Sequence, residues 1–399
     1  MTITFVSNFI NHHQAPLCAQ LYAALGEDFA FIETEPMTQE RMALGWVQDA
    51  EMFAYCRFWE KERAVCEKLF LESDVVLLGW SRLPAKLIEK RLTSGKVTLR
   101  VTERIYKEGQ WKALSPKGLK AKYKEHIRYR RKPVYLLCAG GFVASDFALI
   151  HAYPKKKFRW GYFPEFRKRT RTQWDGAGEG AIRLVFAGRM IDWKHPEYAI
   201  KLAKHLKERS VPFTLEMVGD GPLREPLEGW TKKNGLSGTV LFRKAVTPME
   251  TRGVMEESHI FLFPSNHLEG WGAVVNEAMN SALAVVASDG AGSVPFLIEN
   301  GKSGLTFRSG KYADFERQVL RLVDDRTLCR TLGLNAYRVI ETEWNAETAA
   351  KRLLSFCETL LKEGRAEAFP GTGPLSEAPV IRPRKSGGGR REPNRQDHT

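Results

Sequence analysis

The sequence predicts an α/β protein of two domains, each with a parallel β-sheet covered on both faces by helices. The chain has 399 residues, which is long for one hydrophobic core. Short apolar runs rich in β-branched residues alternate with segments of helical periodicity along most of that length. Polar or glycine-rich loops follow several of these runs, as they do at the carboxyl ends of strands in parallel sheets.

The composition favours a globular protein of a reducing compartment. Apolar residues make up 43% of the chain, which argues against disorder. The six cysteines are scattered, with no Cys-x-x-Cys pair. The N-terminus does not resemble a signal peptide, and the most apolar window, 133–150, contains Asp146 and is too short to span a bilayer. We therefore expect a cytoplasmic protein, attached at most to the inner face of a membrane.

The positive charge is concentrated in the first half of the chain. The net charge is +14. Residues 107–132 contain ten Lys or Arg and two Glu, and residues 155–171 contain eight Lys or Arg and one Glu. The net charges of these two stretches, +8 and +7, account for the whole excess. Such a surface suits an anionic partner.

The first domain is predicted to span residues 1–172. Its expected strands are 2–7, 29–33, 74–79, 95–101 and 134–138, and its expected helical segments are 15–25, a partly charged region ending at Arg57, 59–71 and 84–92. The loop after the first strand contains Asn11, His12 and His13, and Gly140 and Gly141 end the last strand. Because ligands of open α/β folds bind at carboxyl strand ends, we expect these five residues to contact an acceptor. Either histidine could instead cap the following helix.

A basic amphipathic helix is expected to start at Ser115, within the basic stretch 115–132. Leu119, Tyr123 and Ile127 form one apolar stripe, and lysines and arginines occupy the other positions. Such a helix lies against anionic lipid headgroups or a polyanionic acceptor, or it packs on the sheet through its stripe and is otherwise solvated. The sequence leaves both alternatives open.

The second domain is predicted to span residues 181–345, after a linker at 173–180. Its first strand, 181–187, is followed by Gly188, Arg189 and Lys194. Two cations beside a turn at a carboxyl strand end suit a diphosphate, because Arg supplies a planar fork and Lys a point charge. A terminal helix at 346–362 is expected to cross back to the first domain. The segment 363–399 is rich in Pro, Gly, Ser and Arg and is expected to be a disordered basic tail.

The stretch 261–279 of the second domain combines a strand, a tight loop and a helix start. Gly270 and Gly272 lack a Cβ atom, so a bound group can approach the backbone there. Free N–H groups near Gly272 and Ala273 suit an anion. Glu269 and Glu277 are separated by seven residues and are placed to face one crevice.

This pattern resembles the signature of family-4 retaining glycosyltransferases of the GT-B fold, in which two Rossmann-like domains face a central cleft. The resemblance rests on Pro264-Ser265, Glu269-Gly-Trp-Gly and Glu277-Ala-Met, and it continues through 185–189 and 285–288. It covers about residues 181–345 well and the first half loosely. The chain departs from the family pattern at Ala282, Ala284 and Phe296, where the family usually has Gly, Pro and Glu.

The resemblance implies an enzyme that transfers a sugar from a nucleotide-sugar donor such as a UDP-sugar, with retention of anomeric configuration, in cell-surface polysaccharide synthesis. The acceptor would be a glycan, a lipid-linked molecule or a small molecule. Glu269 would hold sugar hydroxyls and Glu277 ribose hydroxyls, with no metal or other cofactor. The implied donor-binding residues are Gly188, Arg189, Lys194, Arg243, Val246, Glu269, Gly270, Trp271, Gly272, Ala273, Val274 and Glu277.

The expected catalytic residues are Glu269, Arg189, Lys194 and Glu103. In many relatives a histidine of the first domain approaches the donor sugar, and this sequence shows no equivalent. Glu103, which follows the strand 95–101, is the candidate in its place, because a carboxylate could steady a positively charged transition state. Its alternative role is a salt bridge with Arg104 or a neighbouring lysine.

Two other functions fit parts of the sequence. A non-catalytic GT-B module could bind a nucleotide or polyanion as a partner subunit, but the intact set of Arg189, Lys194, Glu269 and Glu277 argues against it. A nucleic-acid-binding protein would explain the basic stretches, but no helix-turn-helix, zinc finger or RNA-binding motif accompanies them. We expect no nucleic-acid partner.

Overall fold

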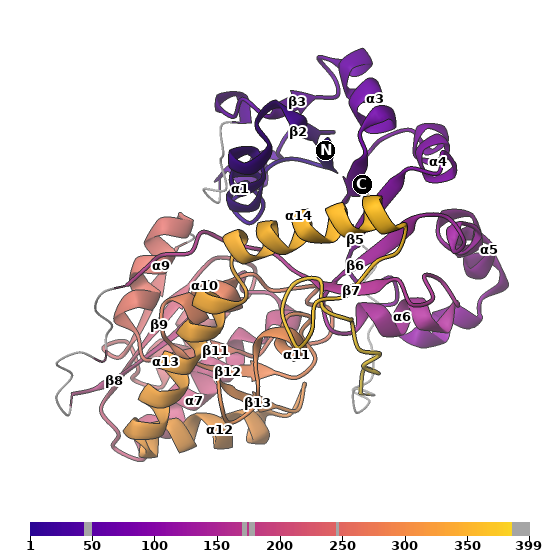
Figure 1. Ribbon diagram of the computed structural model, residues 1–399. Coiled ribbons are helices and arrows are strands. Elements are labelled where there is room, and N and C mark those ends of the chain that lie inside the picture. The colour runs from indigo at the N-terminus through magenta and orange to yellow at the C-terminus, as the bar shows by residue number, and fades with distance from the viewer. Residues whose placement is uncertain (44–49, 170–173, 175–179, 245–246, 385–399) are drawn as a thin grey trace.

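The computed structural model describes residues 1–43, 50–169, 174, 180–244 and 247–384. Two parallel sheets, one above the other in Figure 1, form the two halves of the molecule. This arrangement confirms the predicted fold class.

The first sheet has seven parallel strands in the order β3-β2-β1-β4-β5-β6-β7. Its strands are β1 (Ile3–Ser7), β2 (Phe29–Glu33), β3 (Cys56–Phe58), β4 (Val75–Leu78), β5 (Val97–Thr102), β6 (Val134–Ala139) and β7 (Lys157–Trp160). Its α-helices are α1 (Ala15–Leu25), α2 (Gln39–Ala43), α3 (Arg63–Glu72), α4 (Ala85–Thr93), α5 (Pro116–Glu125) and α6 (Val143–Leu149). Short 3-10 helices are η1 (Gly26–Asp28), η2 (Ala50–Met52), η3 (Gln110–Leu114) and η4 (Ile127–Tyr129).

The second sheet has six parallel strands in the order β10-β9-β8-β11-β12-β13. Its strands are β8 (Ile182–Ala187), β9 (Phe213–Val218), β10 (Val240–Arg243), β11 (Ile260–Phe263), β12 (Ala284–Ser288) and β13 (Leu305–Phe307). Its helices are η5 (Asp192–Lys194), α7 (Pro196–Glu208), α8 (Arg224–Lys233), α9 (Pro248–Glu257), α10 (Val274–Asn280), α11 (Val294–Leu297), α12 (Tyr312–Asp324) and α13 (Arg326–Thr342).

The central strands are apolar along their whole length because helices cover both faces of each sheet. Every residue of β1, β4, β6, β11 and β12 is buried. Continuous apolar strands are typical of parallel sheets, whereas sheets with one solvated face show alternation.

One element of the first domain differs from the prediction. Residues up to Arg57 are predicted to be helical, but Cys56–Phe58 form β3 at the edge of the sheet. Phe31 of β2 pairs with Cys56, and Tyr55 and Cys56 are buried. Backbone pairing along the open edge of β2, together with this burial, outweighs the local helical preference.

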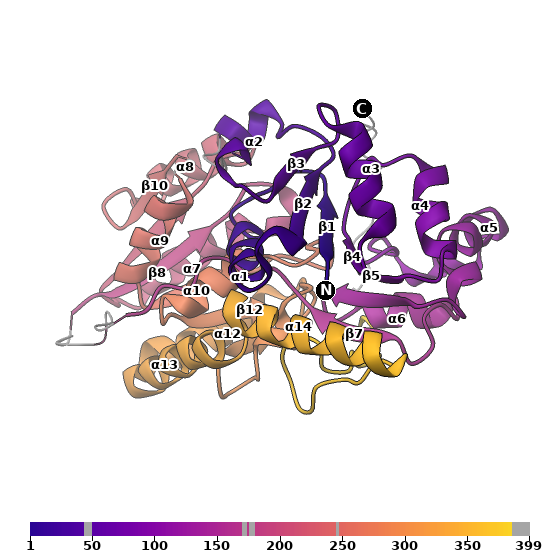
Figure 2. The ribbon, with the colours of Figure 1, turned by 45° about the horizontal axis from the view of Figure 1, so that its top comes forward.

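The chain returns to the first domain after α13. The helix α14 (Ala346–Glu363) packs against α1, and Phe356 meets the rings of Tyr135 and Phe158. In both Figure 1 and Figure 2, α14 lies across the junction of the two halves.

The predicted disorder of 363–399 is wrong for residues 363–384. Phe158 of β7 forms a bridge with Glu377, and Leu375 and Ser376 are fully buried. The main-chain N–H of Leu375 and the carbonyl of Ser376 bond the backbone of Arg159. Composition alone misses this order, because the segment gains its partners from a distant strand. Residues 385–399 lie outside the described residues.

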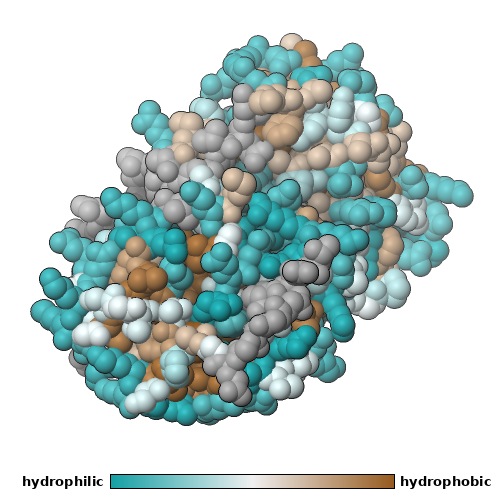
Figure 3. Space-filling model, turned by 90° about the vertical axis from the view of Figure 1, so that its left-hand side faces the viewer, coloured by the Kyte–Doolittle hydropathy of each residue, from teal (hydrophilic) through white to brown (hydrophobic). Residues whose placement is uncertain are grey.

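None of the helices that the structure describes is both long and apolar enough to cross a membrane. Figure 3 shows the left-hand side of Figure 1, where hydrophilic residues cover most of the face and apolar residues lie between them. The helix α5 lies on the other side, at the outer edge of the first domain in Figures 1 and 2.

Candidate functional site

The carboxyl ends of β8 and β11 bring two predicted residues together. Lys194, in η5 after β8, forms an ion pair with Glu269, in the loop after β11. Both side chains are mostly buried. The N–H of Asn266 donates to the carbonyl of Trp193 at 2.8 Å, which ties the two loops together. Neighbouring strands of a parallel sheet end at the same edge, so residues 75 positions apart in the sequence meet there.

Arg189 lies beside this pair and faces solvent. Its guanidinium stands over the ring of Trp193 at 5.6 Å from the centroid. It forms no ion pair with any residue in the described part of the chain. Gly188, which precedes it, bonds the carbonyl of Val218 at 3.0 Å and continues the edge of the sheet. A cation held against an aromatic ring without a carboxylate partner remains available to an anionic ligand.

Glu277 is a buried carboxyl group on α10. Its burial raises its pKa to about 7, although the nearby guanidinium groups of Arg252 and Arg167 act in the opposite direction. Across the junction, Nε2 of His12 lies 4.0 Å from Oε1 of Glu277. Burial lowers the pKa of His12 to about 4, so this imidazole is neutral near pH 7. The carboxyl group therefore faces a neutral ring of the other domain.

His12, His13 and Glu277 form a group with the donor atoms of a metal site. One ligand atom from each lies within 4.8 Å of the others. Burial keeps the pKa of His13 well below its usual range, so both rings are neutral, as metal binding requires. Two histidines and one glutamate are a ligand set that zinc accepts. Glu277 is therefore both the predicted ribose contact and a member of this group.

Glu103 reaches across to the second domain. A Cβ atom on Gly270 would lie 1.8 Å from Oε2 of Glu103, so this carboxylate rests directly on the Gly270 backbone. Glu103 also accepts a hydrogen bond from the hydroxyl of Tyr162 at 2.7 Å and pairs with Lys107 at 2.6 Å. The neighbouring Arg104 pairs instead with the buried Asp146. Both predicted roles of Glu103, a site contact and a lysine salt bridge, are compatible with this geometry.

The space beside Gly270, which has no Cβ atom, is filled by the carboxylate of Glu103. Gly292 packs directly on the Gly270 backbone, because a Cβ atom on Gly292 would lie 1.6 Å from the carbonyl oxygen of Gly270. Gly272 has a positive φ of 86°, and a side chain at this position would meet the ring of Phe263. Gly272 and Gly292 thus allow close packing within the second domain, and Gly270 allows the close approach of Glu103 from the first domain.

Two predicted acceptor residues and one predicted donor residue contact the opposite domain. The N–H of Gly141 donates to the carbonyl of Gly292 at 2.8 Å, and a Cβ atom on Gly140 would lie 3.1 Å from the Gly270 carbonyl. Trp271 is 1% exposed, and its indole packs on Tyr162, Phe296 and Trp344. The two glycines are thus covered by the second domain and the Trp271 indole is buried, and their predicted acceptor and donor contacts stay predictions. The sequence could not show that the cleft is closed at this point.

The remaining predicted residues lie around the edge. Asn11 accepts from the N–H of His13 at 2.9 Å and holds the loop that carries both histidines. Ala273 and Val274 begin α10, with Ala273 buried and Val274 partly exposed. The guanidinium of Arg243, on the edge strand β10, donates two hydrogen bonds to Glu216. Val246 lies outside the described residues.

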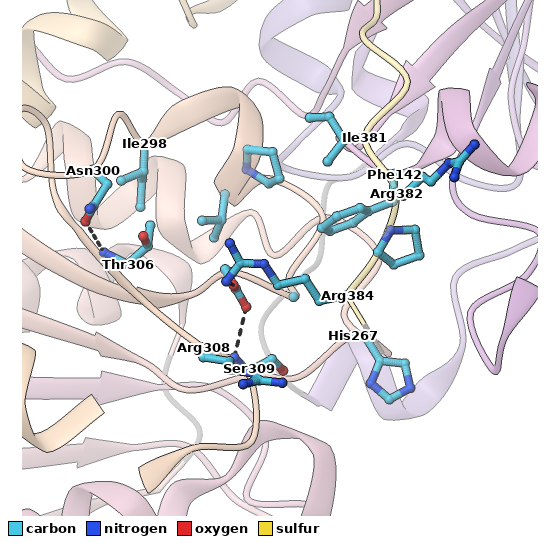
Figure 4. A pocket seen from close by; sticks show the side chains of 15 residues that line it. Phe142, His267, Ile298, Asn300, Thr306, Arg308, Ser309, Ile381, Arg382 and Arg384 are labelled. Carbon is cyan, nitrogen blue, oxygen red and sulfur yellow. Dashed lines mark hydrogen bonds and ion pairs between the residues drawn. The ribbon is translucent and has the colours of Figure 1, made fainter. Parts of the chain in front are cut away.

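Sequence reasoning missed a cavity of about 280 Å³ beside the loop after β12 (Figure 4). Its lining includes Phe142 of the first domain, His267, Asp289, Arg308 and Arg384. Arg384 pairs with Asp289 at 3.2 Å, and Asp289 accepts from the N–H of Ser309 at 2.9 Å. The cavity depends on the C-terminal segment that composition predicts to be disordered. The partly buried Tyr162 and the buried Arg252 were also missed, because both make contacts across the domain junction.

Comparison with known proteins agrees with this geometry. The family model "Glycosyl transferases group 1" matches residues 169–339. The match spans less than half of the chain and shows that the second domain is similar to group 1 glycosyltransferases. This match confirms the resemblance noted for the second domain, and the family covers the loops that carry Arg189, Lys194, Glu269 and Glu277.

The second domain is similar in sequence to glycosyltransferases of several organisms. The chain is 31% identical over 147 residues to 2-deoxystreptamine glucosyltransferase of Streptomyces kanamyceticus, which covers 37% of this chain and 38% of the relative. It is 27% identical over 109 residues to the capsular polysaccharide biosynthesis glycosyltransferase CapM of Staphylococcus aureus, covering 27% and 28%. The chain thus spans less than half the length of these curated relatives.

Solved structures show the fold of the whole chain. The Anabaena protein HepE, solved in complex with UDP, superposes with a TM-score of 0.67 at 14% identity, covering 90% of this chain and 100% of that chain. Similarity at this identity identifies the fold and not the ligand. The two domains together therefore have the GT-B fold.

Proposed function

We propose that this protein is a retaining glycosyltransferase that uses a UDP-sugar donor. The observation that carries the proposal is the Lys194–Glu269 pair at the carboxyl edge of the second sheet, together with Glu277 of the following helix α10, which faces His12 of the first domain. Donor binding would redistribute the existing ion pair, with Glu269 accepting from sugar hydroxyls and Lys194 turning to the diphosphate. A carboxylate accepts hydrogen bonds from two neighbouring hydroxyl groups, which suits both glutamates to a polyhydroxylated ligand.

The two cations would assist departure of the nucleotide. Negative charge grows on the β-phosphate as the glycosidic bond breaks, and Lys194 and Arg189 lie where they could stabilise it. Glu103 would approach the sugar from the first domain, since its carboxylate already rests on Gly270. Contact between the domains at this point would exclude water and limit hydrolysis of the donor. No metal ion is required by this scheme.

UDP is the proposed nucleotide because the HepE structure was solved with UDP, and surface polysaccharide assembly is the proposed context because CapM is a relative. The acceptor would be a glycan, a lipid-linked molecule or a small molecule, and the first domain would bind it on the cytoplasmic side of a membrane. Retention of anomeric configuration follows the retaining family that the second domain resembles.

A thermal-shift panel tests the donor. UDP, GDP, ADP, CMP and their common sugar derivatives would be added to the full chain and to two variants, Glu277→Ala and the matched control Glu225→Ala, which removes an exposed carboxylate of the same domain. We expect UDP compounds to raise Tm for the wild type and the control, and much less for Glu277→Ala. Stabilisation by none of them would contradict the proposal and favour a non-catalytic GT-B module.

A chelator tests the metal-free scheme. UDP release from the best-binding UDP-sugar is expected to be unchanged after EDTA treatment. Loss of turnover that is restored by added Zn²⁺, and not restored in His12→Ala, would instead identify His12, His13 and Glu277 as a required metal site.

A further inference from the structure

The helix α5 is an amphipathic helix whose apolar side is uncovered. None of its ten residues is buried. Leu119 and Tyr123, two of the three residues in the stripe that one interpretation expects to pack on the sheet, are 42% and 54% exposed. Just before the helix, Trp111 and Leu114 of η3 are 64% and 85% exposed. Ile127, the third residue of the stripe, packs against the core of the first domain, so the structure contradicts this packing for Leu119 and Tyr123 only. Four large apolar side chains instead gather on η3 and α5, and we call these four the α5 face.

Unpaired cations surround the α5 face. Within the described ranges, Lys117, Lys120 and Lys124 of α5 form no ion pair, and neither do Arg130 and Arg131 that follow it. Among the neighbouring basic residues in the described ranges, Lys107, Lys112, Lys122 and Arg128 are paired, with Glu103, Glu108, Glu125 and Glu89. Apolar side chains ringed by free lysines and arginines are the composition of a helix that lies in the headgroup region of an anionic membrane.

The α5 face is firmly attached to the part of the chain that enters the domain junction. The side chain of Gln110 in η3 donates to Ser145 and to the buried Asp146, both at 2.9 Å. Asp146 also pairs with Arg104 and accepts from the N–H of Tyr106 at 3.0 Å. Arg104 directly follows Glu103, whose carboxylate rests on the second domain. The segment from the junction to Trp111 is therefore fixed in place by one buried carboxylate.

We propose that the α5 face binds the surface of an anionic lipid bilayer. Trp111 and Leu114 would enter the headgroup region, where an indole finds both an apolar and a polar environment. The free lysines would contact lipid phosphates through flexible stems. A nucleic acid is disfavoured as the partner, because exposed Leu114 and Leu119 have no role in binding a duplex backbone. Binding does not depend on donor chemistry. Its consequence, an acceptor anchored in the bilayer, rests on the proposed glycosyltransferase function.

Vesicle flotation of the full chain tests the α5 face. Vesicles would contain phosphatidylcholine alone or with about 30% phosphatidylglycerol. One variant removes apolar side chains, Trp111→Ala with Leu114→Ala, and another removes charge, Lys117→Ala with Lys120→Ala and Lys124→Ala. Matched controls lie in the second domain: Met249→Ala removes an exposed apolar side chain, and Lys232→Ala with Lys233→Ala and Arg330→Ala removes three exposed cations.

We expect the wild type and both controls to favour anionic vesicles over neutral ones by at least about tenfold, and to be released by about 0.5 M NaCl. Each α5-face variant should bind anionic vesicles about tenfold more weakly and still gain Tm from UDP, which separates this result from failure of the proposed function. Equal binding by the variants and the wild type, equal binding to neutral vesicles, or no vesicle binding at all would overturn the proposal. Tighter binding of double-stranded DNA through the same residues would also overturn it.

Discussion

The two domains use their predicted residues in different ways. In the second domain, Lys194 and Glu269 meet each other at the edge of their own sheet. In the first domain, Glu103 and Gly141 contact backbone atoms of the second domain instead of lining an open surface. The second domain thus carries a site that is assembled locally. The first domain supplies groups that complete this site only when the two halves are in contact.

This difference shows why the two halves differ in how readily they are recognised. A site built at one sheet edge needs a fixed spacing along one stretch of chain, and the family model matches that stretch. Groups that act across a junction need only be brought to the right position by the fold of their own domain. Several residue types and spacings can satisfy that requirement, and the sequence signal is correspondingly weak.

The largest effect is expected at the local site. In Glu269→Gln the partner of Lys194 is lost, and we expect UDP release from the donor to fall on the order of 10²–10³-fold, because stabilising groups at the reacting centre are lost. Glu216→Gln is the matched control, since Glu216 pairs with Arg243 on the outer edge and its change should leave turnover within about twofold. Equal losses of turnover in the two variants, with both folded by circular dichroism, would show that the Lys194–Glu269 pair has no more effect on turnover than the Arg243–Glu216 pair.

A smaller and different effect is expected across the junction. In Glu103→Gln we expect kcat to fall about 10–100-fold while the Kd for UDP is unchanged. The reason is that Glu103 belongs to the first domain and reaches the second domain at Gly270 only when the two domains are in contact. Lys107→Ala, which removes the salt-bridge partner of Glu103 and leaves its contact with Gly270, should lower kcat less. If UDP binding weakens in Glu103→Gln as much as kcat falls, the two domains do not divide the work as described.

The pH dependence of donor binding sharpens the comparison. With a pKa of about 7, Glu277 is about nine-tenths protonated at pH 6 and about nine-tenths ionised at pH 8. Only the ionised carboxylate accepts from both ribose hydroxyls, so UDP-glucose affinity should rise about tenfold from pH 6 to pH 8. The facing His12 and His13 stay neutral in this range, and the nearby Arg252 and Arg167 stay charged.

Isothermal titration calorimetry with UDP-glucose would measure this change, since its diphosphate has no proton to lose between these pH values. Glu277→Gln should bind weakly and with no such slope. A slope of the same size in Glu277→Gln would assign the titration to another group.

The smallest effect concerns the backbone at Ala282. This residue follows the end of α10 with a φ of 58°, in the left-handed region, where the family usually has Gly. Ala282→Gly should raise the free energy of unfolding by about 0.5–1 kcal/mol, or Tm by about 1–3 °C. Ala203→Gly, in the interior of α7, is the control of opposite sign and should lower stability by about 1 kcal/mol. Destabilisation by Ala282→Gly in thermal unfolding would show that the methyl group contributes more by packing than its conformation costs.

The sequence predicts most of the strands and the second-domain site because both depend on local patterns. Buried parallel strands are continuous apolar runs, and Lys194, Glu269 and Glu277 follow strand ends at short distances. The exposure of Leu119 and the burial of Leu375 were not predicted. Amphipathic periodicity shows which side of a helix is apolar but not whether another element covers it, and a Pro- and Gly-rich segment gains order only from a partner far away in the chain.

The departures from the family pattern are also of two kinds, one that depends on local backbone conformation and one that depends on packing between distant segments. Ala282 is a matter of local backbone conformation and can be read from its φ. Phe296 replaces a glutamate in the family and stacks on Trp344, in an aromatic cluster with Trp271 of the loop after β11. Its role follows from packing between segments that are distant in the sequence, which residue type alone does not reveal.

The path of the chain after α13 limits how the two halves can move. The chain passes to the first domain at α14, runs along β7 through Glu377, and returns to the second domain where Arg384 meets Asp289. Two bodies that are connected at separate points cannot rotate freely about one another. A relative motion of the two halves at this point would have to separate the Arg384–Asp289 pair. The C-terminal segment up to Arg384 therefore adds a second tether between the halves, besides the stretch of chain that passes directly from the first domain to the second.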